Sequence, residues 1–90
     1  MATATITIRN ESGFHVRPAQ LFSEKAGTNQ STVMVQPDGT NAQIDGKSIL
    51  GLMTLGLAKG SVITIITDGP DEAEALESLS KLVEDGFGEA

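Results

Sequence analysis

Six consecutive β-branched residues occupy positions 62–67 (VITIIT). Side chains of this kind are stiff at χ1 and fit an extended, packed backbone better than a helix. A run this uniform is typical of a strand at the centre of a sheet. The remainder of the chain must then supply the flanking strands and the helices that cover them.

Three other segments favour strands. Residues 3–9 alternate between threonine and apolar side chains, which places Ala4, Ile6 and Ile8 on one face of a half-buried strand. Residues 32–36 (TVMVQ) predict another strand, residues 37–40 (PDGT) a turn and residues 41–45 a short return strand. The last two strands form a predicted hairpin, whose register the sequence leaves open.

Three segments are predicted to be helical. Residues 16–26 are predicted to be helical and to end at Gly27, because apolar residues recur every three or four positions: Val16, Ala19, Phe22 and Ala26. Residues 49–55 predict a short helix that Gly56 ends. A last helix begins at Asp71 and has Glu72 and Glu74 in its first turn, where carboxylates suit the helix dipole. Its apolar stripe is predicted to be Ala73, Leu76, Leu79 and Val83, and Gly86 and Gly88 end it.

The predicted order is therefore β-α-β-β-α-β-α within one domain, residues 1–90. This order favours an α+β fold in which helices pack on one face of an antiparallel or mixed sheet. The net charge of −6 and six scattered Lys and Arg residues argue against nucleic-acid binding. No segment is typical of a signal peptide or a membrane span, so we expect a cytoplasmic monomer without membrane insertion.

His15 is the only histidine in the chain and lies just before the first predicted helix. If it is the N-cap, the N–H groups of Val16 and Arg17 have no intrahelical partner and can hold an anion beside the ring. Arg17 adds a cation with forked geometry, and Pro18 in the first turn breaks no helical hydrogen bond. In the alternative assignment of helix positions, Arg17 is the N-cap and Pro18 is the first helical residue, which shifts the anion site by about one residue.

This setting favours a histidine that carries a phosphoryl group. The positive end of a helix disfavours imidazolium, and a neutral ring nitrogen can attack phosphorus directly. A complete kinase would need more: residues 51–56 have the glycine spacing of a P-loop, but Leu57 and Ala58 replace its Lys and Ser/Thr. With one His and no Cys we expect no metal site and no cofactor. The predicted role is a phosphoryl carrier between other proteins, not an enzyme.

Two segments resemble the HPr family of the bacterial sugar phosphotransferase system. Residues 13–19 (GFHVRPA) are similar to its active-site signature and residues 47–56 (KSILGLMTLG) to its regulatory-serine segment. The resemblance implies an open-faced β-sandwich with four antiparallel strands under three helices. It implies that enzyme I, charged from phosphoenolpyruvate, phosphorylates His15 on Nδ1, and that sugar-specific enzyme IIA domains receive the group. Arg17 would steady the phosphoryl group, and the cradle would comprise Ser12, Val16, Arg17 and Pro18.

Ser48 has a structural and a regulatory interpretation, which are compatible. Serine is a good N-cap for the short helix that follows. The resemblance also makes Ser48 a target of HPr kinase/phosphorylase, whose phosphate would impede docking to enzyme I and link the chain to a catabolite-control transcription factor. The short helix carries more apolar residues than one face can bury. Leu52 and Leu55 are assigned to the core, and the resemblance implies that Ile49, Leu50 and Met53 lie on the docking surface.

The sequence departs from the family pattern in several places. Phe14 and Val16 stand where Leu or Ile and Ala are more usual, and lysines are sparse around the predicted site. Residues 38–46 are a residue or two longer than usual. Two alternatives therefore stay open: a specialised carrier for a nitrogen-linked or dihydroxyacetone-type chain, and a mainly regulatory module acting through Ser48 phosphate.

Overall fold

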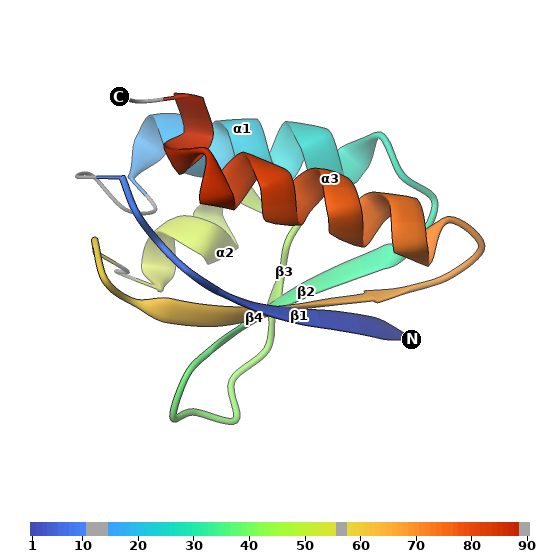
Figure 1. The fold of residues 1–90 in the computed structure, drawn as a ribbon, viewed down its shortest axis with the longest axis horizontal. Coiled ribbons are helices and arrows are strands. Elements are labelled where there is room, and N and C mark those ends of the chain that lie inside the picture. Colours follow the sequence, from blue (N-terminus) through green and yellow to red (C-terminus); the bar gives the residue numbers. More distant parts are fainter. Residues whose placement is uncertain (11–14, 56–57, 89–90) are drawn as a thin grey trace.

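The computed structural model describes residues 1–10, 15–55 and 58–88. Three helices lie on one side of a four-stranded sheet (Figure 1). The strands are β1 (Ala2–Thr7), β2 (Thr32–Pro37), β3 (Ile44–Asp45) and β4 (Val62–Asp68), and the helices are α1 (Val16–Gly27), α2 (Ile49–Thr54) and α3 (Glu72–Glu84). A short 3-10 turn, η1 (Gly86–Gly88), follows α3. The element order and the helix-covered antiparallel sheet are those predicted. Within these ranges no helix is long and apolar enough to cross a membrane.

The β-branched run is a central strand of the sheet. The strand order is β1-β4-β2-β3, and every neighbouring pair is antiparallel. Thr5 lies opposite Thr64 across the β1–β4 ladder, and Val35 lies opposite both Ile65 and Ile44. The hairpin register that the sequence left open is thus fixed by Val35 and Ile44. The return strand is shorter than predicted, because only Ile44 and Asp45 pair with β2.

The core lies between the helices and the inward face of the sheet. It contains apolar side chains from the three helices, from β1, β2 and β4, and from the segments that follow β1 and α3: Ile6, Ile8, Ala19, Phe22, Ala26, Val33, Val35, Leu52, Ile63, Ile65, Leu79, Val83 and Phe87. Each strand of the β1–β4–β2 ladder contributes alternate residues, as period-2 patterning requires. The predicted inward residues of the first strand, Ala4, Ile6 and Ile8, do face the core.

Two predicted core residues are wrong. Val16 is half exposed, and the buried row of α1 consists of Pro18, Ala19, Phe22, Ser23 and Ala26. Ala73 is also exposed, and Ala75 takes its place at the start of the α3 stripe. Ala75, Leu79 and Val83 follow one another at intervals of four, so they form a single row that faces the sheet, whereas Ala73 lies about 200° around the helix from Ala75.

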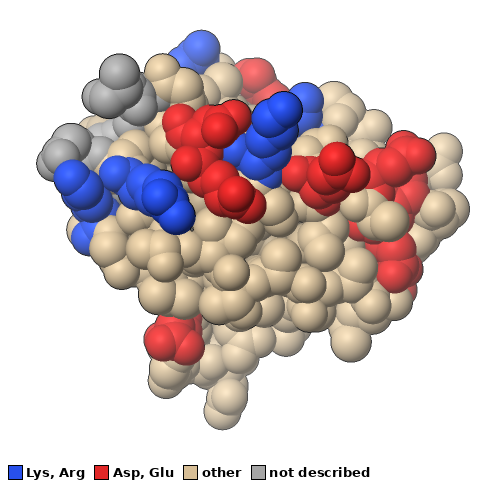
Figure 2. All heavy atoms as spheres, in the orientation of Figure 1, with Lys and Arg blue, Asp and Glu red and all other residues tan. Residues whose placement is uncertain are grey.

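Charged side chains are spread unevenly over the surface. In Figure 2 they cover the helices and both ends of the molecule, and a belt without Lys, Arg, Asp or Glu crosses the middle of this face. In Figure 1, which has the same orientation, β1 crosses the molecule at this level. The strand itself carries no charged residue from Ala2 to Thr7.

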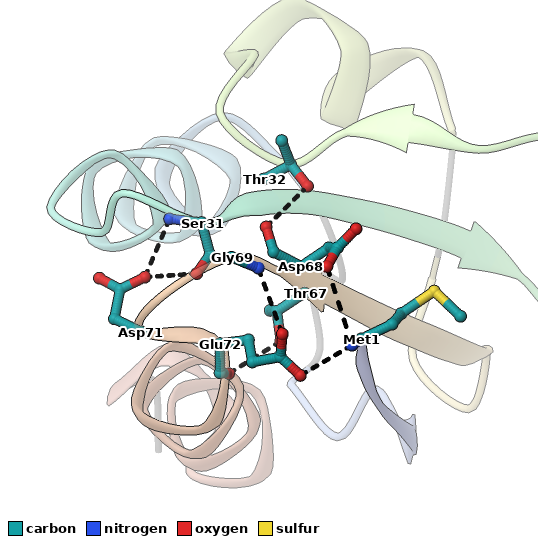
Figure 3. Close-up of polar contacts among 8 residues, drawn as sticks. All are labelled: Met1, Ser31, Thr32, Thr67, Asp68, Gly69, Asp71 and Glu72. Carbon is teal, nitrogen blue, oxygen red and sulfur yellow. Dashed lines mark hydrogen bonds and ion pairs between the residues drawn. The ribbon is translucent and has the colours of Figure 1, made fainter.

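A polar cluster joins the start of α3 to one end of the sheet (Figure 3). This end of the sheet lies on the opposite side of the molecule from the start of α1 (Figure 1). The Asp71 carboxylate accepts hydrogen bonds from the Gln30 N–H at 3.0 Å, the Ser31 N–H at 2.9 Å and the Ser31 hydroxyl. The Ser31 hydroxyl is the main cause of a lowered pKa for Asp71, followed by the two backbone N–H groups. Asp71 therefore joins the loop after α1 to the start of α3, instead of capping its own helix.

The chain terminus belongs to the same cluster. The Met1 amine lies 2.9 Å from a Glu72 carboxylate oxygen and 3.7 Å from an Asp68 oxygen. The hydrogen bond between Met1 and Glu72 lowers the pKa of the carboxyl and raises the pKa of the amine. Glu72 also accepts from the Gly69 N–H at 3.3 Å, so one carboxylate holds both the first residue and the turn after β4.

Candidate phosphoryl-acceptor site

His15 is the N-cap of α1. Its backbone is extended, with φ −84° and ψ −170°, and its side chain makes no capping hydrogen bond. The first helical hydrogen bond runs from the Ala19 N–H to the His15 carbonyl at 2.9 Å. The side chain is exposed. The ring thus lies at the positive end of a twelve-residue helix and is accessible to another protein.

The first turn of α1 leaves backbone donors unused. Because the helical ladder starts at Ala19, the N–H groups of Val16 and Arg17 have no partner within the helix, and neither N–H group donates to another described residue. Pro18 is the third helical residue, where its missing N–H removes no helical bond. His15 is therefore the N-cap of α1 in the structure, and the alternative assignment with Arg17 as the N-cap is wrong.

Arg17 and Val16 are both exposed beside His15. Figure 2 shows Lys and Arg side chains gathered at the end of the molecule where α1 begins in Figure 1. Arg17 is two residues from His15, and the N–H groups of Val16 and Arg17 have no partner among the described residues, so together they provide donors suited to phosphate oxygens. Ser12, the remaining member of the predicted cradle, lies outside the described residues, as does Phe14.

The short helix α2 lies against α1 at the same end of the molecule (Figure 1). Ser48 is its N-cap, as predicted: the Ser48 Oγ accepts a hydrogen bond from the Gly51 N–H at 3.1 Å. The residue before it is anchored from both sides, because the Lys47 N–H donates to an Asp45 carboxylate oxygen at 2.9 Å and Lys47 Nζ donates to the Asn29 carbonyl at 3.0 Å. Ser48 is half-buried.

The apolar residues of α2 divide as predicted. Leu52 is fully buried and Leu55 partly buried, so these two side chains attach the helix to the core. Ile49, Leu50 and Met53 are 40%, 75% and 38% exposed, and together with Val16 they account for the exposed large apolar side chains apart from Met1 among the described residues. We call Val16, Ile49, Leu50 and Met53 the apolar patch.

These observations limit the chemistry available at the site. Among the described residues no group of three or more His, Asp or Glu side chains could hold a metal ion. The groups present are an accessible imidazole, an arginine and helix N–H donors without a partner among the described residues, which can accept and stabilise a phosphoryl group. The sequence predicted these groups but not the cluster around Asp71. A single Asp before a helix gives no signal about a partner 40 residues away, such as Ser31.

Known proteins are similar to this chain over nearly its whole length. Residues 2–85 match the family described as "PTS HPr component phosphorylation site". The phosphocarrier protein HPr of Neisseria meningitidis serogroup B is 43% identical over 89 residues, which are 99% of this chain and 98% of the relative. The HPr-like protein Crh of Bacillus subtilis is 38% identical over 85 residues, which are 94% of this chain and 98% of the relative.

Solved structures agree with these sequence relationships. HPr-C-His from Thermoanaerobacter tengcongensis superposes with a TM-score of 0.94 at 41% identity and covers 100% of this chain and 99% of its own. The phosphocarrier protein HPr from Bacillus anthracis superposes with a TM-score of 0.84 at 35% identity, over 91% of this chain and 95% of its own. This chain therefore belongs to the HPr family of phosphocarrier proteins of the phosphotransferase system.

Proposed function

We propose that this chain accepts a phosphoryl group on His15 Nδ1 from enzyme I, charged from phosphoenolpyruvate, and passes it to sugar-specific enzyme IIA domains in the cytoplasm. The observation that carries the proposal is the exposed His15 ring at the N-cap of α1, beside the unpaired N–H groups of Val16 and Arg17. In the transfer, a ring-nitrogen lone pair attacks phosphorus, the bond from phosphorus to the donor breaks, and a phosphoramidate forms on His15. Return of the group to the next acceptor reverses these steps.

The protein part of this reaction is mainly positioning and charge neutralisation. The helix N-terminus and Arg17 would stabilise the added negative charge on the phosphoryl oxygens, and Ser12 and Pro18 would complete the cradle. The helix N-terminus and Arg17 would not hold the phosphoryl group permanently, because the site is open to solvent and the donors are few. Such an arrangement suits a carrier that must give up its phosphoryl group as readily as it takes it.

The apolar patch supports docking to several partners. A small exposed cluster containing Met53 and Leu50 can adapt to different apolar surfaces without binding any of them tightly. The patch lies on α2 and the first turn of α1, and these two helices are in contact. We therefore propose Ile49, Leu50 and Met53 as the residues through which enzyme I and enzyme IIA domains align their active sites with His15.

A second, regulatory function is proposed for Ser48. Its place at the N-cap of α2 would let a phosphate contact free N–H groups at the helix start, while about two negative charges appear beside the apolar patch. This change would impede docking to enzyme I. Relatives named HPr-like protein Crh favour a regulatory branch within the family, and one of their structures is described as a catabolite repression protein. The kinase would be an HPr kinase/phosphorylase, and the reader of the phosphate a catabolite-control transcription factor.

The decisive experiment is incubation with enzyme I and labelled phosphoenolpyruvate, followed by mapping of the modified residue. We expect an acid-labile, alkali-stable label on His15 that chases onto sugar-specific enzyme IIA domains. Label on His15→Ala would refute the acceptor assignment. Chase only onto nitrogen-linked or dihydroxyacetone-type partners would instead identify a specialised carrier.

Arg17 is tested with a matched pair of variants. Arg17→Ala should slow phosphoryl transfer, whereas Lys25→Ala, which removes a cation from the last turn of the same helix, should not. Both side chains are exposed, so both variants should keep the unfolding temperature of the parent. Equal transfer rates for the two variants would remove Arg17 from the mechanism.

A further inference from the structure

Asp–Gly is a dipeptide in which the aspartyl side chain can react with its own main chain. The side-chain carboxyl carbon can reach the next backbone nitrogen to form a five-membered ring, and a glycine there has no Cβ to hinder the approach. Because the two reacting residues are the same at every such step, only the structure can distinguish one step from another. The sequence contains four of them: Asp38–Gly39, Asp45–Gly46, Asp68–Gly69 and Asp85–Gly86.

Two of these steps have a glycine nitrogen that is already hydrogen-bonded. The Gly46 N–H donates to the Val33 carbonyl at 2.7 Å, and Gly46 is buried. The Gly69 N–H donates to a Glu72 carboxylate oxygen at 3.3 Å. Attack by either nitrogen would first break this hydrogen bond and move the backbone away from its partner.

A third step lies at the end of α3 and is covered by other parts of the chain. Asp85 is the C-cap of this helix and donates its N–H to the Lys81 carbonyl at 2.9 Å. Gly86 is buried, and a Cβ added to it would lie 3.6 Å from the Asn10 Cβ. The rotation that closes a ring at Asp85 would therefore displace packed backbone.

The remaining step, Asp38–Gly39, is open at both reacting groups. Asp38 and Gly39 are exposed in the turn between β2 and β3, which extends away from the helices (Figure 1). The Gly39 N–H and the Asp38 carboxylate bond to no described residue. The Asp38 N–H donates to the Val62 carbonyl at 2.9 Å, so the fold holds the nitrogen before the reacting side chain and not the nitrogen after it.

The hydrogen bonds that close this turn are also exposed. The Thr40 N–H and hydroxyl both donate to the Pro37 carbonyl, at 3.3 Å and 3.0 Å. Exposed bonds at the tip of a turn open locally at a small cost in free energy, without unfolding of the core. The backbone at residues 38–39 can therefore rotate into the ring geometry while the rest of the sheet stays paired.

We propose that Asp38 is a site of spontaneous isomerisation to isoaspartate, and that the fold protects the other three Asp–Gly steps. In the first reaction the Gly39 nitrogen attacks the Asp38 Cγ, the nitrogen loses its proton, and a carboxyl oxygen leaves as water. Water then opens the cyclic imide. Cleavage of the new bond from nitrogen to Cγ restores aspartate, whereas cleavage of the original peptide bond leaves the main chain running through Cγ.

The product has one additional main-chain atom in the turn and a carboxylate on the Asp38 Cα. It is a substrate of the class that S-adenosylmethionine-dependent isoaspartyl methyltransferases modify. Asp38 and Gly39 are not among the residues assigned to phosphoryl transfer, so this proposal stands apart from the proposed function.

Peptide mapping of the folded protein after prolonged incubation is the primary test. Trypsin separates residues 26–47, 60–81 and 82–90, and a protease that cleaves before aspartate but not before isoaspartate then distinguishes Asp38 from Asp45. We expect isoaspartate to accumulate at Asp38, with no more than traces at the other three steps. Accumulation at Asp45, Asp68 or Asp85 as fast as at Asp38 would overturn the proposal.

The same chain unfolded in guanidinium chloride shows whether the fold makes this selection. Without the fold, all four steps should isomerise at similar rates. Folding should slow the reaction by at least about tenfold at Asp45, Asp68 and Asp85, where it requires local opening, and should change the rate at Asp38 much less. A reaction at Asp38 that folding slows as much as the others would contradict the proposal.

Two glutamate variants test the reacting side chain. Asp38→Glu keeps the charge, but its longer side chain would have to close a six-membered ring, which forms far more slowly. The matched control Asp68→Glu makes the same change at a protected step. Both side chains are exposed, so both variants should fold like the parent.

Total isoaspartate in each variant is measured with an isoaspartyl methyltransferase and labelled S-adenosylmethionine. After incubation of the folded proteins, the label should fall to background in Asp38→Glu and stay at the level of the parent in Asp68→Glu. Equal labelling of the two variants would refute the assignment to Asp38.

Discussion

Leu52 is the side chain that attaches α2 to the rest of the protein. The helix has six residues, too few for stability on its own, and Leu52 is its only buried residue. Replacing it with alanine removes apolar contacts and leaves a cavity that the surroundings fill only in part. We expect Leu52→Ala to reduce the free energy of unfolding by about 3 kcal/mol, within the range of about 2–5 kcal/mol typical of buried leucines.

The matched control is two residues away on the same helix. Leu50 is 75% exposed, so Leu50→Ala should change the free energy of unfolding by less than about 0.5 kcal/mol. Urea unfolding followed by circular dichroism measures both variants. With a slope of about 1–1.5 kcal/mol per molar for a chain of this size, the midpoint of Leu52→Ala should fall by about 2–3 M.

Amide exchange shows whether Leu52 supports the helix α2. A domain with an unfolding free energy of about 5–10 kcal/mol remains folded after this loss, but α2 opens more often than the sheet. Amide exchange in residues 49–54 should therefore accelerate more in Leu52→Ala than exchange in β4. If Leu50→Ala destabilised the protein as much as Leu52→Ala, the assignment of these two leucines to surface and core would be wrong.

Three further predictions concern other parts of the molecule. Gly69→Ala should destabilise the fold by at least about 1–3 kcal/mol, because the φ angle of Gly69 is +151° and an added Cβ would lie 2.7 Å from the Ser31 Cα. The control Gly27→Ala has open space around the added Cβ, so it should not lower the melting temperature. The pKa of Asp71 is lowered in the folded state, so its contribution is complete above the ordinary value of 3.8 and is lost as pH falls below it; in urea titrations at pH 2–5 stability should depend less on pH in Asp71→Asn, and an unchanged pH dependence would contradict this role. Leu50→Glu should slow phosphoryl transfer from enzyme I while leaving the melting temperature within a few degrees of the parent; an unchanged rate would exclude Leu50 from the docking surface.

The position of His15 shows how far local sequence can be taken. Periodicity from Val16 to Ala26 and the proline at 18 predicted a helix start near residue 15 with His15 as its N-cap, but a rival assignment with Arg17 at the cap stayed open. The choice between them depends on the backbone conformation of His15, which is extended, and on the Ala19 bond to its carbonyl. Sequence alone could therefore point to His15 as the proposed acceptor, but it could not decide which backbone N–H groups at the start of α1 lack a helical partner.

The errors in the predicted core have a similar origin. Val16 and Ala73 fit an apolar period of three or four, yet both are exposed. Periodicity states which residues share a helix face; it does not state how far along the helix that face is covered by other elements. For α1 the covered row begins at Pro18, and for α3 it passes through Ala75.

What the sequence determined by itself was local: the strand at 62–67 from its β-branched side chains, the first and last helices from their periodicity, the short helix from its apolar run and flanking glycines, and the chemistry of a single histidine two residues before an arginine. These properties depend on neighbours within one turn or one strand. Tertiary structure decided the strand order, the hairpin register, the exposure of the apolar patch and the joining of Ser31 to Asp71. Each of these depends on contacts between different elements of the fold, from nine positions apart for Val35 and Ile44 to 40 for Ser31 and Asp71. Such contacts are set by the simultaneous packing of the whole core and not by any one segment.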